Sequence, residues 1–190
     1  YMKLSKKDYL YLEKLLKKFN KNTYSEKKYP LLEDGFTEMD IIKGIEVLLS
    51  KKITMSNITK KFEFEFGKFI GSKYCLMVNS GSSANLLAAF ALINPLKKNK
   101  LRKGDEFIIP SLCWSTSLWP FIQAGLKPKF IDVDIDNFCL DSNLINNNYY
   151  KNCKAIVNIH ILGNCSNIEK IKKYSENKNI HLIEDTCEAL

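Results

Sequence analysis

Apolar and polar positions alternate along this chain with two different periods, and the first period is helical. Over residues 3–20, apolar side chains recur near helical spacing with lysines between them, at Leu4, Tyr11, Leu12, Leu15, Leu16 and Phe19. This spacing predicts an amphipathic helix, which we expect to form an N-terminal arm. The polar segment 21–30 follows and ends at a proline, so it is the best candidate for a linker.

A second helix is predicted over residues 37–49. Thr37 stands at the N-cap position, and Asp40 stands at the third helical position. The pair is a weaker relative of the capping box, in which the N-cap and N3 side chains each bind the other residue's backbone N–H. We therefore expect Thr37 to fix the start of this helix.

From residue 62 onward, short runs rich in β-branched and apolar residues alternate with helical stretches. Strands are predicted near 74–78, 106–109, 129–133, 155–159 and 180–184. Helices fit near 58–70, 82–93, 115–124 and 167–177. This order is typical of βαβ units, so the sequence predicts an α/β fold with a mostly parallel sheet and helices on both faces.

Composition agrees with a globular protein. A chain of 190 residues with 45% hydrophobic content can bury one sizeable core, as one domain or one domain plus a fragment. Its apolar runs are far shorter than the roughly 20 residues that span a bilayer, and its start lacks the apolar centre of a signal peptide. We expect a soluble, cytoplasmic protein without a membrane partner.

The formal net charge of +8 raises the possibility of nucleic-acid binding. The lysines are scattered among asparagine and glutamate, however, as on an ordinary solvated surface. We therefore expect no nucleic-acid partner. A basic surface can still attract an anionic substrate that carries phosphate.

No metal site is expected. The six cysteines form no C-x-x-C pair, and only two histidines accompany them, so reduced, packed thiols are the better interpretation. Asp132, Asp134 and Asp136 are spaced like the first ligands of a calcium loop. That pattern then fails, because Asn137 replaces the required glycine and Asn143 replaces the required glutamate.

A candidate phosphate site lies in the segment MVNSGSSANLL, residues 77–87. An apolar run leads into Ser80, Gly81, Ser82 and Ser83, and helical periodicity follows. The start of a helix offers unpaired N–H groups and the positive end of its dipole, and glycine allows a close approach. A plain serine-capped helix is the alternative, and neither the Walker nor the dinucleotide glycine pattern is present.

Two further segments place candidate groups after strands. In IIPSLCWSTSLWP, residues 108–120, Trp114 follows a strand and could stack on a flat ring or simply close the core; packing is the expected role of Trp119. In NIHLIEDTCEAL, residues 179–190, Glu184 and Asp185 end the last strand. Asp185 could cap a helix, bind a metal or pair with a ring nitrogen.

Taken in this order, the motifs resemble those of the DegT-type sugar aminotransferase family, including its nucleotide-sugar 3-dehydratase branch. The resemblance covers residues 29–190 and rests on YPLLEDGFTEMDIIKGIEVLLSKKITM, FEFEFGKFIGSKYCLMVNSGSSANLL, KGDEFIIPSLCWSTS, AGLKPKFIDVDIDNFCLD, HILGN and LIEDTCEAL. It implies the large domain of a pyridoxal-phosphate (PLP) dependent transferase of the aspartate aminotransferase type, incomplete at its C-terminus. Residues 1–28 would be the arm and linker, and 29–190 the N-terminal part of that domain.

By this resemblance, PLP or pyridoxamine phosphate is the cofactor. Its phosphate would bind Gly81, Ser82 and Ser83, Trp114 would stack on its ring, and Asp185 would pair with the ring nitrogen. Glu188 falls near the ring hydroxyl, where family aminotransferases commonly have glutamine. His160, which precedes a turn, is a weaker candidate for lining the substrate site.

The leading hypothesis is an aminotransferase that moves an amino group, with glutamate as the expected donor, to a nucleotide-linked keto sugar in glycan or lipopolysaccharide biosynthesis. The alternative is a PLP-dependent nucleotide-sugar 3-dehydratase, in which histidine replaces the Schiff-base lysine; Glu188 and the CWST and HILGN segments resemble that branch. The resemblance places the lysine or histidine beyond Leu190, so the catalytic residue is unknown here.

Two other functions stay open. The chain could be a non-catalytic fragment that binds PLP or a sugar nucleotide, because no catalytic lysine can be assigned. It could also be a nucleotide-binding α/β domain without PLP, although the glycine fingerprint is missing. Family members build their site across a homodimer, so we expect a homodimer for the full protein and an inactive 190-residue chain by itself.

Overall fold

The computed structural model describes residues 4–20, 35–54 and 56–189. The chain divides into two compact units, Tyr1–Met77 and Val78–Leu190. The predicted linker 21–30 and the predicted boundary after residue 28 lie outside the described residues. The division into an arm, 1–28, and a large domain, 29–190, therefore stays a prediction. In the part of the chain that is described, no helix combines the length and apolarity needed to cross a membrane.

The first unit is helical. Its helices are α1, Lys6–Asn20, α2, Glu38–Leu49, and α3, Asn57–Ile70. The predicted capping box is confirmed: Thr37 Oγ1 accepts the Asp40 N–H at 3.4 Å, and Asp40 Oδ2 accepts the Thr37 N–H at 2.7 Å. The Lys43 ammonium of α2 donates to the Tyr9 hydroxyl of α1 at 2.7 Å, so these two helices contact each other.

The strand predicted over residues 74–78 is wrong, because this segment forms neither strand nor helix. Leu76 is 65% exposed and Met77 is 54% exposed. A strand exists only where a neighbour accepts and donates its backbone hydrogen bonds, and no described segment pairs with residues 74–78. The apolar composition of residues 74–78 favours a strand, but it cannot show whether a neighbouring strand is present to pair with it.

The second unit holds a four-stranded sheet in the order β2-β1-β3-β4, with every pairing parallel. Its strands are β1, Glu106–Pro110, β2, Lys127–Ile131, β3, Ala155–Ile159, and β4, His181–Asp185. Four predicted strands are thus confirmed with small shifts. The largest shift is at β2, which pairs with β1 through Pro128; an edge strand tolerates a proline that lacks an N–H donor.

Three α-helices accompany this sheet: α4, Gly81–Ile93, α5, Ser115–Gln123, and α6, Ile168–Lys178. Two short 3₁₀ helices, Asn148–Tyr150 and Ile161–Gly163, lie before and after β3. The helices predicted over 82–93, 115–124 and 167–177 agree with α4, α5 and α6 to within one residue at either end.

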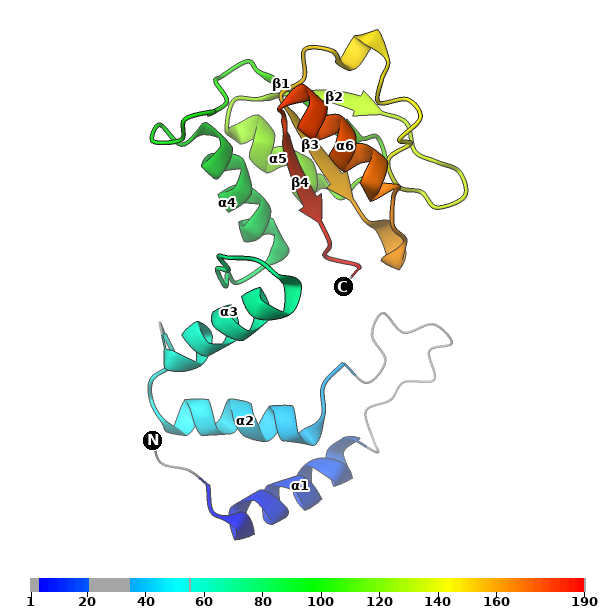
Figure 1. The fold of residues 1–190 in the computed structure, drawn as a ribbon. Coiled ribbons are helices and arrows are strands. Elements are labelled where there is room, and N and C mark those ends of the chain that lie inside the picture. The colour runs from blue at the N-terminus through cyan, green and yellow to red at the C-terminus, as the bar shows by residue number, and fades with distance from the viewer. Residues whose placement is uncertain (1–3, 21–34, 55, 190) are drawn as a thin grey trace. The chain divides into compact units, whose positions relative to one another are not determined.

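Helices cover both faces of the sheet, as predicted (Figure 1). Strand side chains point alternately to opposite faces. Phe107 and Val157 belong to the core that includes Phe121 of α5. Their sequence neighbours Ile108 and Ile156 point to the other face and belong to the core that includes Tyr174 of α6. Parallel strands buried on both sides leave their carboxyl ends as the place for a ligand.

Candidate functional site

A cavity of about 590 Å³ lies at the carboxyl ends of β1, β3 and β4. Its walls come from the start of α4, from the segment after β1 and from the segments after β3 and β4. The lining residues are Gly81, Ser82, Asn85, Leu112, Cys113, Trp114, Thr116, Ser117, Ile159, His160, Ile161, Leu162, Asp185, Cys187 and Glu188. The folded chain thus brings together most of the predicted site residues.

The N-terminus of α4 forms one wall. Ser80 caps this helix, and its Oγ accepts the Ser83 N–H at 3.2 Å. Gly81 and Ser82 line the cavity at the first two helical positions, where N–H groups have no partner inside the helix. Ser83 is not among the lining residues, and its N–H donates to the cap. A part for these residues in phosphate binding stays a prediction.

Trp114 stands at the N-cap of α5 and lines the cavity. Its side chain is 75% exposed, so it does not close the core. An indole in this position can meet the face of a flat ligand. Trp119, for which packing was expected, is 58% exposed on α5 and is not among the cavity-lining residues.

Asp185, the last residue of β4, is held by two side chains that the sequence did not single out. Its Oδ2 accepts hydrogen bonds from Asn85 Nδ2 and from Ser117 Oγ, each at 2.8 Å. Among the described residues, its Oδ1 accepts the Cys187 N–H alone, at 3.2 Å. One signal was available for Asn85: it is the single polar residue among the apolar residues that follow Ser83 in α4. None was available for Ser117.

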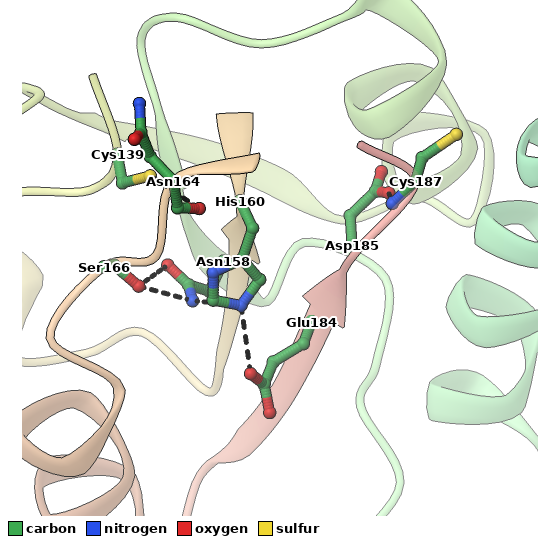
Figure 2. Close-up of polar contacts among 8 residues, drawn as sticks. All are labelled: Cys139, Asn158, His160, Asn164, Ser166, Glu184, Asp185 and Cys187. Carbon is green, nitrogen blue, oxygen red and sulfur yellow. Dashed lines mark hydrogen bonds and ion pairs between the residues drawn. The ribbon is translucent and has the colours of Figure 1, made fainter. Parts of the chain in front are cut away.

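Glu188 and His160 both line the cavity, and each contacts a different partner. Glu188 Oε2 accepts the Leu162 N–H at 2.7 Å and so joins the segments after β3 and β4. His160 is buried, and its Nε2 lies 3.1 Å from Glu184 Oε2. Figure 2 shows Glu184 and Asp185 pointing away from each other, with the imidazole on the Glu184 side. A substrate-lining role for His160 stays a prediction.

A buried polar group surrounds His160 (Figure 2). The Asn158 amide donates to Ser166 Oγ at 2.8 Å, and the Ser166 hydroxyl donates back to Asn158 Oδ1 at 3.0 Å. Asn158 is fully buried, and its register partner in β4 is Glu184. This group cross-links β3 to β4 and to the start of α6, which keeps the strand ends in place.

Two cysteines, Cys113 and Cys187, also line the cavity. Burial raises the pKa of the Cys113 thiol above its ordinary value, so the protonated form is favoured near neutral pH. Cys187, in the segment after β4, is exposed. A methyl group on Gly81 would approach Cys187 Sγ to 3.4 Å, so the α4 N-terminus and the segment after β4 are close neighbours.

Comparison with known proteins gives relatives over most of the chain. GDP-4-keto-6-deoxy-D-mannose 3-dehydratase of Escherichia coli is 40% identical over 162 residues, which cover 85% of this chain and 42% of the relative. The UDP-4-amino-4-deoxy-L-arabinose–oxoglutarate aminotransferase of Shewanella sediminis is 30% identical over 162 residues, 85% of this chain and 40% of the relative. The chain therefore spans about two fifths of these relatives.

Solved structures named GDP-4-keto-6-deoxymannose-3-dehydratase are similar throughout the matched part. One, the E. coli enzyme with bound hydrated PLP, has a TM-score of 0.79 at 40% identity. Two more, with a trapped PLP-glutamate geminal diamine and, in a mutant, with bound GDP-perosamine, have TM-scores of 0.78 and 0.80, also at 40% identity. Each match covers 86% of this chain and 42% of the solved chain.

These likenesses confirm the predicted fold class, the large domain of a PLP-dependent transferase with a parallel sheet. A family model also matches residues 37–190, which include the four strands that the structure describes and the whole cavity. The chain belongs to the DegT/DnrJ/EryC1/StrS aminotransferase family.

Proposed function

We propose that this chain is the cofactor-binding part of a PLP-dependent 3-dehydratase that acts on a nucleotide-linked 4-keto-6-deoxy sugar. The observation that carries the proposal is the 40% identity to a 3-dehydratase over 162 residues, against 30% to an aminotransferase over the same length. Glu188, where family aminotransferases commonly have glutamine, supports the same choice. The leading sequence hypothesis, an aminotransferase, thus becomes the second candidate.

The cavity is a chemical match for PLP. Its phosphate would meet the N–H groups of Gly81 and Ser82, which carry the positive end of the α4 dipole. Trp114 offers an exposed ring face, and Asp185 offers a carboxylate with capacity left on Oδ1. The cavity thus offers N–H donors for the phosphate, an aromatic side chain for the ring face and a carboxylate for the ring nitrogen. These three groups come from three separate walls and suit the three parts of this cofactor.

When bound, PLP would supply a pyridine ring that withdraws electrons from the attached substrate carbon. The residues of this chain would hold the ring and control its charge. Asp185 would favour a proton on the ring nitrogen through its negative charge. Trp114 would cover one ring face and exclude water from it, and Glu188 would keep the segment after β3 in position. The residue that moves the substrate proton is expected beyond Leu190.

The first test uses the protein expressed from its complete reading frame with PLP, GDP-4-keto-6-deoxymannose and glutamate. A 3-dehydratase should give a sugar that has lost the C3 oxygen, while glutamate is oxidised to 2-oxoglutarate and its nitrogen is released as ammonia. Mass spectrometry of the sugar and an ammonia assay read out both products. A sugar that keeps its C3 hydroxyl, with no ammonia released, would contradict the proposal.

The same assay tests the aminotransferase. Its product would carry an amine in place of the keto oxygen, and the glutamate nitrogen would stay on the sugar. The family name and the 30% identity to the Shewanella aminotransferase favour this second candidate. The residue at the catalytic position also separates the two, since lysine supports the aminotransferase and histidine supports the 3-dehydratase.

Partners follow from the same proposal. A nucleotide-linked keto sugar and glutamate would be the substrates, in glycan or lipopolysaccharide biosynthesis. We also propose a homodimer, supported by two exposed apolar side chains beside the cavity, Leu112 and Trp114. Sedimentation of the complete protein tests this, and a monomer at micromolar concentration would contradict it.

If the complete protein retains no PLP, that result would favour the non-catalytic interpretation or the nucleotide-binding domain without PLP.

A further inference from the structure

We infer that Asn85 and Ser117 are positioning residues that fix Asp185 so that its Oδ1 faces the nitrogen of the cofactor ring. This inference rests on the proposed function, because it assigns Asp185 to a PLP ring. It goes further by naming the two residues that orient the carboxylate and the single oxygen that is left to act.

The contacts come from two different helices. The Asn85 amide of α4 and the Ser117 hydroxyl of α5 both donate to Asp185 Oδ2, at 2.8 Å each. Both side chains are buried, with 8% and 3% exposure. Hydrogen bonds to a carboxylate are about twice as strong as neutral ones, so buried donors of this kind hold its rotation firmly.

The orientation of the Asn85 amide follows from its neighbours. Its Nδ2 also lies 3.4 Å from the Thr116 carbonyl oxygen. A carbonyl and a carboxylate are both acceptors, so both require the NH₂ end of the amide. Asn85 therefore donates to Asp185 and, through the Thr116 carbonyl, contacts the first turn of α5. Ser117 lies in the same turn, so the two donors are coupled.

The two carboxylate oxygens are left unequal. From the part of the chain that the structure describes, Oδ2 has two donors at 2.8 Å, whereas Oδ1 has one longer contact, from the Cys187 N–H at 3.2 Å. A carboxylate oxygen can accept about two hydrogen bonds, so Oδ1 keeps one free. Oδ1 is thus the atom available to a protonated ring nitrogen, and a carboxylate fixed in advance needs no reorganisation when that nitrogen binds.

The test uses the complete protein with PLP and compares Ser117→Ala, Asn85→Leu and Asp185→Asn with wild type. Ser115→Ala is the matched control, since this exposed serine of α5 neither lines the cavity nor contacts Asp185. Ser117→Ala and Asn85→Leu should each weaken PLP binding about tenfold, as expected for loss of a hydrogen bond to a charged group. Both should also change the pH dependence of the visible absorption band and lower kcat more than they raise KM.

Circular dichroism checks that each variant folds, and Ser117→Ala removes a single oxygen, so it keeps the test valid if Asn85→Leu does not fold. One result would overturn this inference alone: a folded Ser117→Ala protein that keeps wild-type PLP affinity and an unchanged absorption band, while Asp185→Asn loses the cofactor. A wild-type protein that binds no PLP would overturn the proposed function and the inference together.

Discussion

Glu188 Oε2 accepts the backbone N–H of Leu162 at 2.7 Å, although 26 residues separate them along the chain. Leu162 has φ 53° and ψ 32°, in the left-handed region that leucine rarely adopts. Such a conformation costs about 1 to 3 kcal/mol and persists only where surrounding contacts hold it. The Glu188 carboxylate is one such contact, so it helps to shape the cavity wall.

Replacing Glu188 tests this role. Glu188→Ala should lower the free energy of unfolding by about 1 kcal/mol, because the Leu162 N–H loses a charged acceptor at an exposed site. Glu188→Gln keeps an oxygen acceptor and should lose less than half of that amount. Urea unfolding of the complete protein, followed by circular dichroism, measures both. Equal unfolding midpoints for Glu188→Ala and wild type would contradict the prediction.

Leu162→Asn should stabilise the protein by about 0.5 to 1 kcal/mol, because asparagine adopts the left-handed conformation at lower cost. Little apolar burial is lost, since Leu162 is 75% exposed. Leu96→Asn is the control: this leucine is 92% exposed and is not among the residues with positive φ. Thermal unfolding compares the two variants, and equal shifts would show that backbone strain at Leu162 is not relieved.

Asp105 and Lys154 should make stability depend on pH. Burial acts to raise the pKa of Asp105, but hydrogen bonds from Lys154 Nζ at 2.8 Å and the Arg102 N–H at 2.7 Å outweigh it, so the folded pKa lies below its ordinary value. The stabilisation is therefore present above the unfolded pKa of about 4 and is lost as pH falls through the folded pKa.

Lys154→Met should accordingly cost less than about 1 kcal/mol near neutral pH, because the lysine side chain is 55% exposed and screened. The cost should shrink in acid. Lys151→Met serves as the control, since no carboxylate of the described residues pairs with Lys151. Urea unfolding at several pH values gives the difference, and a Lys154→Met cost that grows as pH falls would refute the assignment.

Thiol labelling should follow exposure. Burial raises the pKa of Cys153 to about 12 and also raises the pKa of Cys113, so both thiols carry little of the reactive thiolate. Cys165 and Cys187 are exposed and should react with iodoacetamide first. Peptide mass mapping over time reads the order.

PLP should protect Cys187, which lines the cavity, and leave Cys165 unprotected. Cys165 is thus the internal control. Labelling of Cys153 in the folded protein as fast as Cys165 would contradict the predicted order, and equal labelling of Cys187 with and without PLP would contradict the position of the cofactor.

The elements of the second unit were predictable because their patterns are local. Residues 155–159 are apolar except for Asn158, and all five are buried in β3. The run 74–78 is also mostly apolar, but none of the described strands pairs with it, and composition cannot show that a neighbour is missing. At β2, Pro128 obscured the start of a strand whose register depends on β1.

The site was predictable only where a residue follows a strand or begins a helix. Gly81, Trp114 and Asp185 fulfil that rule, and all three line the cavity. Asn85 and Ser117 do not, because each lies within a helix and acquires its role from Asp185, which is 100 and 68 residues away along the chain. Contacts at that separation depend on how α4 and α5 pack against the sheet, which local pattern does not encode.

Helix α6 ends at Asn179, which has a left-handed φ of 52°. This turn determines which face of the sheet each side chain of β4 points to. Glu184 and Asp185 are both acidic, so a one-residue insertion between Asn179 and His181 would leave a strand of nearly the same composition. It would nevertheless exchange the two carboxylates between the sheet faces, since side chains alternate with a period of two. Homologues that differ in length at this turn should therefore be aligned by the acidic residue whose side chain faces the cavity, and not by the nearest aspartate in the sequence.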